Sequence, residues 1–217
     1  MTQQELLKSG RLLPVMEEFL SLQGEGYHTG EATWFIRIGG CDVGCDWCDV
    51  KESWNADLFP PVKTDIVVEK ALQSKVNAVI VTGGEPLLYN LNYLCDQLKS
   101  LEPQGIKQST FVKTFLETSG SQPLSGRWDW ICLSPKQEWA PREEFYGFSD
   151  ELKVIIHQEE DFNWAEKQAE RMRPAAHRFL QPEWSQRNRM LPLIIRYIES
   201  NPSWRLSLQT HKYIGIP

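Results

Sequence analysis

The feature that most constrains the fold is an alternation of apolar, β-rich runs with segments of helical periodicity. Each β-rich run is short and carries branched and aromatic residues, as strands do. The expected strands are residues 32–38, 77–83, 109–118, 128–134, 151–157, 178–182 and 204–209. Helical patterns lie between several of them, at 64–75, 91–101, 162–172 and 190–200. Strands that alternate with helices predict an α/β fold with a largely parallel sheet, open or curled into part of a barrel.

Two of the expected helices carry additional signals. Thr64 has a hydroxyl that can cap the helix that follows it. Leucines at 91, 94, 98 and 101 recur at i, i+3, i+7 and i+10, so they form one apolar stripe. That stripe is expected to face the core.

The 217 residues are within the range of a single α/β domain with one buried core. We expect residues 1–14 to be an N-terminal extension and residues 203–217 to form a last strand and a tail. Residues 51–63 and 137–149 look like loop insertions. No internal repeat or linker interrupts the pattern, so one domain spanning 1–217 is predicted.

Charge and hydropathy exclude several classes of protein. The net charge of −6 does not supply the positive field that attracts phosphates, so a small-molecule substrate is expected rather than nucleic acid. The first residues lack the basic start and apolar run of a secretory signal, and no run of 18 apolar residues occurs. The sequence therefore predicts a cytoplasmic protein with no membrane partner.

Unusual polar residues collect where the expected strands end. The segments are Thr82-Gly-Gly-Glu-Pro, Glu117-Thr-Ser-Gly, Ser134-Pro-Lys and Gln181-Pro-Glu. Any one of them alone could be only a turn, since glycine and proline punctuate loops everywhere. Ligands of α/β proteins bind at the carboxyl ends of parallel strands, so the four segments together predict one shared site.

Three of the five cysteines, Cys41, Cys45 and Cys48, fall within eight residues. In a reducing compartment this clustering indicates metal or redox chemistry rather than a disulfide framework. The remaining cysteines, Cys95 and Cys132, lie in apolar runs and are expected in the core.

The spacing of the three thiols suits a four-iron four-sulfur cluster. A glycine-containing loop that leaves a strand can wrap a cubane so that each thiolate reaches a different iron, which leaves the fourth iron open. A structural zinc site is the main alternative, but it almost always takes four ligands, and no fourth Cys or His stands at finger spacing. Three buried core cysteines are a second alternative, which the interleaved Asp42, Asp46 and Asp49 disfavour.

Cys-x3-Cys-x2-Cys with Trp47 before its last cysteine, followed by Gly83-Gly-Glu-Pro86, resembles the radical S-adenosylmethionine (SAM) superfamily. The resemblance implies a [4Fe-4S] cluster on the three cysteines and SAM on the open iron, where one electron releases a 5′-deoxyadenosyl radical. It also implies that the Gly-Gly-Glu-Pro strand holds the SAM amino group, with glycine letting the ligand approach the main chain.

Phe19-Leu-Ser-Leu-Gln-Gly-Glu-Gly26 and the final His211-Lys-Tyr-Ile-Gly-Ile-Pro217 narrow the resemblance to the 7-carboxy-7-deazaguanine synthase family, from about residue 15 to the end. It implies a partial, modified (β/α) radical SAM barrel that works as a homodimer with a reductant such as flavodoxin or ferredoxin. The implied reaction contracts the ring of 6-carboxy-5,6,7,8-tetrahydropterin to 7-carboxy-7-deazaguanine with loss of ammonia, for queuosine or another deazapurine.

The resemblance also implies roles for individual residues. The residues expected to bind the pterin are Leu22, Gln23, Gly24, Glu25, Arg37, Thr82, His211 and Pro217, the last through its terminal carboxylate. Those expected to bind SAM are Gly84, Glu117, Thr118, Ser119, Ser134, Pro135, Lys136, Gln181, Pro182, Glu183 and Trp184. The residue types of the first set fit a pterin acid. A carboxylate such as that of Glu25 can accept from the pterin N–H groups, and Arg37 can pair with the pterin carboxylate.

The family also implies Mg²⁺, held by a threonine hydroxyl two residues after the last cysteine. Val50 stands at that position, and valine offers no oxygen to a hard cation. Asp49, water or substrate oxygens are the remaining ligands, so weaker magnesium dependence than in threonine-bearing relatives is expected.

Two other functions are compatible with parts of the pattern. A glycyl-radical activating enzyme has a similar size and cluster spacing but acts on a protein partner. A non-catalytic iron–sulfur protein needs no SAM site. The Gln-Gly-Glu-Gly segment and the Ile-Gly-Ile-Pro tail favour the pterin enzyme.

Overall fold

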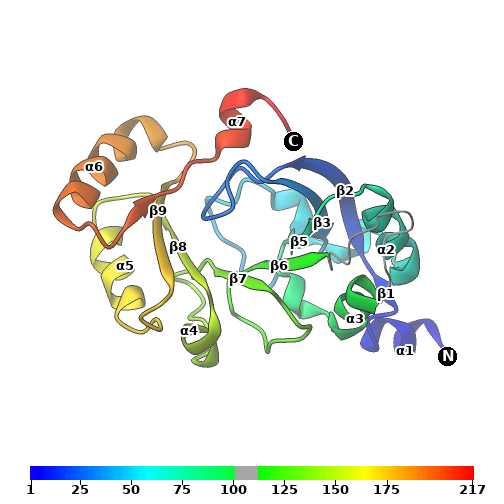
Figure 1. The fold of residues 1–217 in the computed structure, drawn as a ribbon. Coiled ribbons are helices and arrows are strands. Elements are labelled where there is room, and N and C mark those ends of the chain that lie inside the picture. The colour runs from blue at the N-terminus through cyan, green and yellow to red at the C-terminus, as the bar shows by residue number, and fades with distance from the viewer. Residues whose placement is uncertain (101–111) are drawn as a thin grey trace.

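The computed structural model describes residues 1–100 and 112–217, in which one eight-stranded sheet curves through the molecule (Figure 1). The strand order is β10-β9-β8-β7-β6-β5-β3-β2, and every neighbouring pair is parallel except β2 with β3. Strands β2 and β10 stand at opposite ends of this order and do not pair with each other in the described residues, so the sheet stays open, and the expected partial, modified barrel is confirmed. The strands are β2 (Val15–Leu22), β3 (Ala32–Ile38), β5 (Ala78–Gly83), β6 (Lys113–Thr118), β7 (Trp130–Leu133), β8 (Glu151–Ile156), β9 (His177–Pro182) and β10 (Arg205–Leu206).

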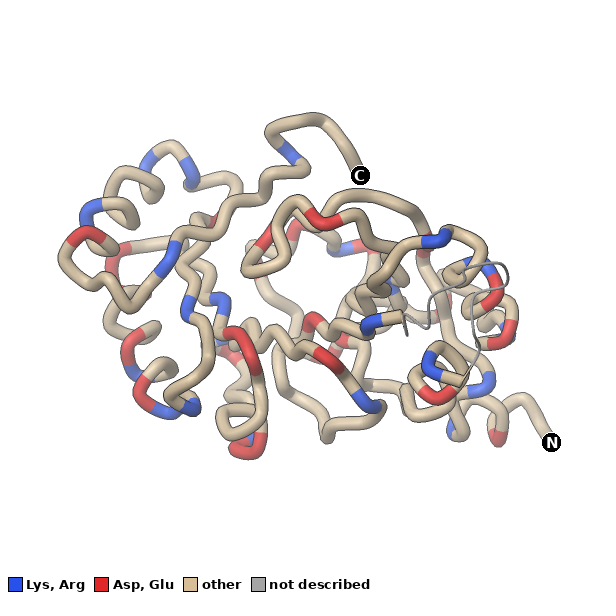
Figure 2. Tube along the Cα trace, viewed as in Figure 1, with Lys and Arg blue, Asp and Glu red and all other residues tan. Residues whose placement is uncertain are grey.

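Helices lie along the outside of this sheet, and a separate two-stranded sheet pairs β1 (Leu12–Leu13) with β4 (Val62–Lys63) (Figure 1). The α-helices are α1 (Gln3–Lys8), α2 (Thr64–Gln73), α3 (Asn92–Ser100), α4 (Glu144–Phe148), α5 (Asp161–Ala169), α6 (Arg187–Ser200) and α7 (Thr210–Ile214). Short 3-10 helices are η1 (Lys51–Trp54), η2 (Ala56–Leu58) and η3 (Pro86–Leu88). No helix in the described ranges is long and apolar enough to cross a bilayer. Figure 2 shows acidic and basic residues interspersed along the described chain.

A large apolar core joins the sheet to the helices, and a second, small cluster is made by Ala78, Ile80 and Phe115. The predicted leucine stripe is buried through Leu91, Leu94 and Leu98, whereas its last member, Leu101, lies outside the described residues. Cys95 and Cys132 are also in the interior, at 0% and 1% exposure, as expected for core thiols. Truncating a buried leucine to alanine typically costs about 2–5 kcal/mol, so this stripe fixes α3 against the sheet.

Several local predictions need correction. Thr64 does not cap α2, since Lys63 occupies the cap position and the Thr64 hydroxyl donates to the Gly10 carbonyl (2.6 Å). Strand β2 was not expected, because it is an edge strand with no fully buried residue and therefore lacks a continuous apolar run. The first residues of the expected strand 109–118 lie outside the described ranges, and the strand 204–209 shrinks to β10, followed by α7.

The two expected loop insertions are more ordered than predicted. Residues 137–149 contain α4, whose Phe145 and Tyr146 are fully buried. Residues 51–63 contain η1, η2 and β4. The Ser53 carbonyl accepts from the Gly40 amide (2.6 Å), so this second segment braces the chain just before the first clustered cysteine.

Candidate active site

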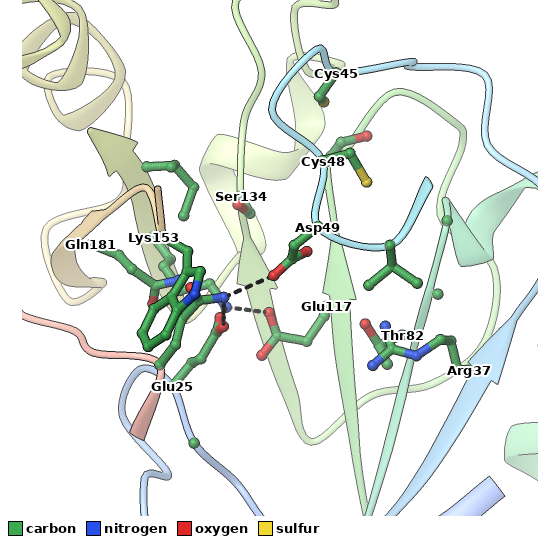
Figure 3. A pocket seen from close by; sticks show the side chains of 18 of the residues that line it. Glu25, Arg37, Cys45, Cys48, Asp49, Thr82, Glu117, Ser134, Lys153 and Gln181 are labelled. Carbon is green, nitrogen blue, oxygen red and sulfur yellow. Dashed lines mark hydrogen bonds and ion pairs between the residues drawn. The ribbon is translucent and has the colours of Figure 1, made fainter. Parts of the chain in front are cut away.

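A cavity of about 360 Å³ lies at the carboxyl ends of the parallel strands (Figure 3), and the C-terminal tail lines part of it through His211, Lys212 and Pro217. It is lined by all three clustered cysteines and by every residue expected to bind pterin or SAM except Pro135. Pro135 instead lines a neighbouring cavity beside His157 and Trp164. The shared site is therefore assembled from segments between Leu22 and Pro217, while the individual binding roles remain predictions.

The two glycines at the end of β5 bring the cysteine loop close to the sheet. A Cβ at Gly84 would lie 2.2 Å from the Gly40 carbonyl oxygen, and Gly83 has a φ of +149°, in a region that favours glycine. The Glu85 amide donates to the same Gly40 carbonyl (2.8 Å). Glycine is thus required for the loop to pack on the strand end, in addition to the expected close approach of a ligand to the main chain.

Glu85 ties the ends of β5 and β6 together from a position that is 1% exposed. One of its carboxylate oxygens accepts from Thr118 Oγ1 (2.7 Å) and the Leu87 amide (3.1 Å). The other accepts from the Ser119 amide (2.9 Å) and Ser119 Oγ (2.6 Å). Burial raises the pKa of Glu85, opposed by these hydrogen bonds. The carboxylate therefore acts as a structural clamp under the cavity, and it occupies the hydroxyls of Thr118 and Ser119.

The cysteine loop follows β3 and carries three soft donors. The Cys48 amide donates to the Cys45 carbonyl (3.0 Å), while Gly44 takes a φ of +65° in the turn before it. Burial raises the pKa of Cys45 to about 11, partly opposed by the nearby Lys136. No three His, Cys, Asp or Glu side chains in the described ranges form a ready-made metal site. The donor set nevertheless fits an iron–sulfur cluster with one open corner, because it provides three thiols on one loop.

The part of the cavity expected to hold SAM is built from β6, β7 and β9. Lys136 Nζ donates to the Ser134 carbonyl (2.5 Å) and Ser134 Oγ (2.7 Å), and it lies 5.6 Å from the ring centroid of Trp47. Burial lowers the pKa of Lys136. A compact cationic group is thereby fixed beside the cysteine loop.

The part expected to hold the pterin is built from the chain that follows β2. Gly24 contacts α7 so closely that a Cβ there would lie 2.1 Å from His211 Nδ1, and the Thr210 amide donates to its carbonyl (2.9 Å). Ser21 Oγ donates to a terminal oxygen of Pro217 (2.8 Å). The tail docks through these polar contacts, whereas its apolar Tyr213 and Ile214 are more than half exposed.

Arg37 and Thr82 stand side by side on adjacent parallel strands, as partners in the register of β3 with β5. Arg37 Nε donates to Glu17 (2.6 Å), and the arginine side chain is 21% exposed. Glu17 therefore orients the guanidinium and leaves its two terminal nitrogens available in the cavity.

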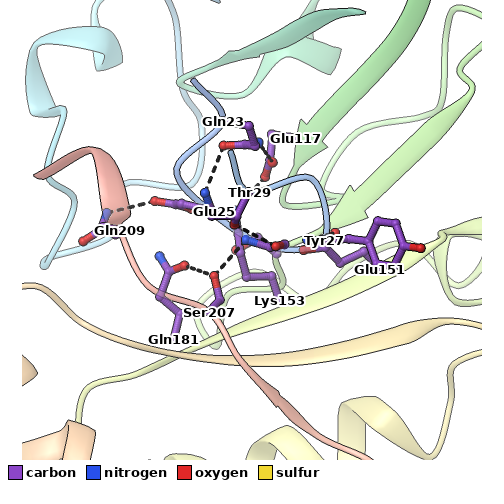
Figure 4. A network of polar contacts seen from close by, with 12 residues as sticks. Gln23, Glu25, Tyr27, Thr29, Glu117, Glu151, Lys153, Gln181, Ser207 and Gln209 are labelled. Atoms are coloured by element: carbon purple, nitrogen blue, oxygen red, sulfur yellow. Dashed lines mark hydrogen bonds and ion pairs between the residues drawn. The ribbon is translucent and has the colours of Figure 1, made fainter. Parts of the chain in front are cut away.

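Sequence analysis missed Lys153, the most deeply buried charged side chain of the cavity at 5% exposure. Its ammonium donates to Glu25 (2.6 Å) and to Glu117 (2.8 Å) (Figure 4). A period-two signal was present, because polar Glu151 and Lys153 alternate with the buried Leu152 and Val154 on β8.

Gln209 and Lys212, to which no role was assigned from the sequence, connect the tail to Asp49 in the cysteine loop. Asp49 accepts from Lys212 Nζ (2.5 Å) and from Gln209 Nε2 (3.1 Å), and Gln209 also donates to Glu25 (3.0 Å). Burial alone would raise the pKa of Asp49, but the contacts with Lys212 and Gln209 lower it. The loop that would hold a cluster is thus linked by side chains to the pterin part of the cavity.

Known proteins match this chain along nearly its whole length. A profile described as "Radical SAM superfamily" matches residues 35–132. A Flavobacterium psychrophilum protein named 7-carboxy-7-deazaguanine synthase is 52% identical over 211 residues, covering 97% of this chain and 96% of that protein. A synthase of the same name from Synechocystis sp. is 46% identical over 203 residues, covering 94% and 93%.

The chain belongs to the 7-carboxy-7-deazaguanine synthase family. Its fold agrees with this, since the crystal structure of QueE from Escherichia coli matches with a TM-score of 0.78 and 25% identity over 97% of this chain and 99% of that one. As a radical SAM protein it uses a [4Fe-4S] cluster and SAM. The zinc-site and core-cysteine interpretations of the three thiols are thereby set aside.

Proposed function

We propose that this protein is a 7-carboxy-7-deazaguanine synthase, which contracts the ring of 6-carboxy-5,6,7,8-tetrahydropterin with loss of ammonia. The observation that carries the proposal is the meeting of the cysteine loop, the segment 22–25 and the tail 211–217 around one cavity. The whole-length identity to synthases of that name supports it. A glycyl-radical activating enzyme, which acts on a protein partner, would have no use for a cavity lined by pterin-binding residues.

The chemistry supplied by the bound cluster and SAM is generation of a radical that removes hydrogen from carbon. Cys41, Cys45 and Cys48 would hold the cluster, and all three line the cavity. The residues proposed to hold SAM are Gly84, Glu117, Thr118, Ser119, Ser134, Pro135, Lys136, Gln181, Pro182, Glu183 and Trp184. Of these, Pro135 lines the neighbouring cavity and not the main one, so we expect it to support Ser134 and Lys136 and not to contact SAM directly.

The protein's own contribution is to orient one C–H bond of the pterin and to keep water from it. Burial alone would raise the pKa of Glu25, but the ammonium of Lys153, with hydrogen bonds from Lys153 and Gln209, lowers it to about 2. Glu25 is therefore ionised and accepts hydrogen bonds from the ring N–H and amino groups. Arg37 would pair with the pterin carboxylate, since its terminal nitrogens point into the same cavity as Thr82.

The remaining pterin contacts are proposed for Leu22, Gln23, Gly24, His211 and the carboxylate of Pro217. Burial lowers the pKa of His211, so the imidazole is neutral near pH 7 and can accept as well as donate. Ser21 on β2 holds the end of the tail through its hydrogen bond to Pro217. The tail would thus cover the bound pterin.

Magnesium fits this cavity poorly. Val50 lines it without an oxygen, and the nearby Asp49 carboxylate already has Lys212 and Gln209 as partners. We propose that any Mg²⁺ is bound mainly by substrate oxygens and water, with weaker dependence than in relatives that carry threonine.

We further propose a homodimer that receives electrons from a flavodoxin- or ferredoxin-type reductant in the cytoplasm. A reducing compartment suits the three free thiols of the cysteine loop. The net charge of −6 favours a small-molecule substrate over nucleic acid.

The decisive experiment is anaerobic reconstitution of the protein with iron and sulfide, followed by incubation with SAM, a reductant and the carboxytetrahydropterin. We expect 7-carboxy-7-deazaguanine and one ammonia per product, detected by mass spectrometry and an ammonia assay. Cluster-loaded protein that cleaves SAM but leaves the carboxypterin unchanged would contradict the proposal.

A further inference from the structure

We propose that Lys153 is a positioning residue that holds the pterin site and the SAM site in register through one buried ammonium. The inference rests on the proposed function and deepens it, because it assigns a role to a residue outside the predicted site set. The Lys153 ammonium contacts two residues that are expected to bind the pterin and SAM. It acts through Glu25 on the pterin side and Glu117 on the SAM side.

The geometry supports a connection between the two sites. Lys153 Nζ lies 2.6 Å from Glu25 and 2.8 Å from Glu117, and the three side chains are 5%, 18% and 20% exposed. Gln23 Nε2 also donates to Glu117 (3.2 Å), and the Gln23 carbonyl-type oxygen accepts from the Glu25 amide (3.1 Å). Segment 23–25 and the end of β6 therefore share one set of contacts, with the ammonium at its centre (Figure 4).

The lysine is rigidly placed for this purpose. It sits in the middle of β8, between Leu152 and Val154, which are fully buried on the opposite face of the sheet. Burial alone would lower the pKa of Lys153, but Cys132 and the carboxylates of Glu117, Glu25 and Glu151 outweigh it and hold the pKa well above its usual value. The group is therefore a cation near pH 7.

The same contact sets the charge of Glu25. Without the ammonium, burial would dominate and raise the pKa of Glu25 above its ordinary range. A protonated Glu25 would lose one acceptor oxygen for the pterin N–H groups. The titratable groups that face Glu25 are Lys153 on β8, Glu117 on β6, His211 and Lys212 on α7, and Asp49 in the cysteine loop.

The test uses cluster-loaded protein with Lys153→Gln, which keeps a polar side chain but removes the charge, and Lys153→Arg, which keeps the charge. Lys99→Gln is the matched control, because it removes a partly buried ammonium from an ion pair with Asp129, and neither residue lines the cavity. For each protein we would measure the KM for the carboxypterin from pH 6 to 8. The ratio of deoxyadenosine released to product formed would be measured in the same reactions.

For Lys153→Gln we expect a KM at least about tenfold higher, the size of a lost charge-assisted hydrogen bond. We also expect that KM to rise further as pH falls from 8 to 6, whereas the wild-type KM stays flat. Excess deoxyadenosine over product should appear, because SAM is then cleaved beside a misplaced pterin. Lys153→Arg should recover most of the KM and of the ratio, and Lys99→Gln should match the wild type.

A Lys153→Gln protein with wild-type KM, pH profile and product ratio would overturn the inference. If Lys153→Gln does not fold, the test relies on Lys153→Arg. The inference then requires that Lys153→Arg change the ratio of deoxyadenosine to product only slightly and that its KM stay independent of pH. A folded Lys153→Arg protein that releases a large excess of deoxyadenosine over product would also overturn the inference. Wild-type protein that makes no 7-carboxy-7-deazaguanine would instead refute the proposed function.

Discussion

Replacing Glu85 by glutamine should destabilise the protein even though the shape of the side chain is kept. In wild type each carboxylate oxygen accepts one backbone amide, from Leu87 or from Ser119, and one hydroxyl. An amide side chain has only one acceptor oxygen, so its NH₂ group must face one of those backbone N–H groups. The Thr118 hydroxyl cannot easily compensate, because it also accepts from the Gly120 amide (3.0 Å).

The magnitude follows from these contacts. One buried, unsatisfied donor costs about 1–3 kcal/mol. Burial raises the pKa of Glu85, which means that desolvation of the ionised carboxylate offsets part of the stability that its hydrogen bonds contribute. We therefore expect a loss of about 2 kcal/mol, which corresponds to about 4–8 °C in melting temperature for a chain of this size. Glu85→Ala removes all four contacts and should lose about 3–5 kcal/mol.

The assay is urea unfolding followed by circular dichroism, on protein prepared without its cluster so that ligand binding does not contribute. An unchanged slope against urea would show that the midpoint shift reports stability. Glu159→Gln, at an exposed position, is the control and should stay within about 0.5 kcal/mol of wild type. Equal midpoints for wild type and Glu85→Gln would refute the idea that this carboxylate clamps the two strand ends.

Three further predictions concern the site. Cys45→Ala should abolish the cluster's visible absorbance and deoxyadenosine formation, whereas Cys95→Ala, in the core, should keep both; a Cys45→Ala protein with full turnover would contradict the ligand assignment. Val50→Thr should show stronger activation by Mg²⁺ than wild type, because it adds an oxygen ligand, and equal activation curves would count against this view. Adding one glycine after Pro217 should raise the KM for the carboxypterin about tenfold to a hundredfold, because the terminal carboxylate would lose a charge-assisted hydrogen bond. An unchanged KM would show that the tail does not bind the pterin.

Much of the fold was predictable because it depends on local patterns. Short β-rich runs separated by helical stripes predicted a parallel sheet, and the strands at 32–38, 77–83 and 151–157 agree with β3, β5 and β8 within one residue at each end. Edge strand β2 was missed, since a half-exposed strand carries no continuous apolar run. Helix α4 was missed because it is only five residues long and lies in a segment rich in charged residues.

The sequence by itself determined which segments meet. The three cysteines share one loop, and the polar ends of β5, β6, β7 and β9 reach one edge, since parallel strands direct their carboxyl ends to the same side of a sheet. Those two facts are properties of spacing and of strand direction, so they needed no coordinates.

Only the tertiary structure decided what individual side chains do within that site. Gly84 gives room to the Gly40 carbonyl, Glu85 binds donors from β6, and Lys153 joins Glu25 to Glu117 across 128 and 36 residues of sequence. Pairings over such separations depend on strand register and on which face each residue occupies, and a shift of one residue would turn Lys153 to the opposite face of the sheet. Long-range contacts of this kind exist only once the strands have paired in their native register.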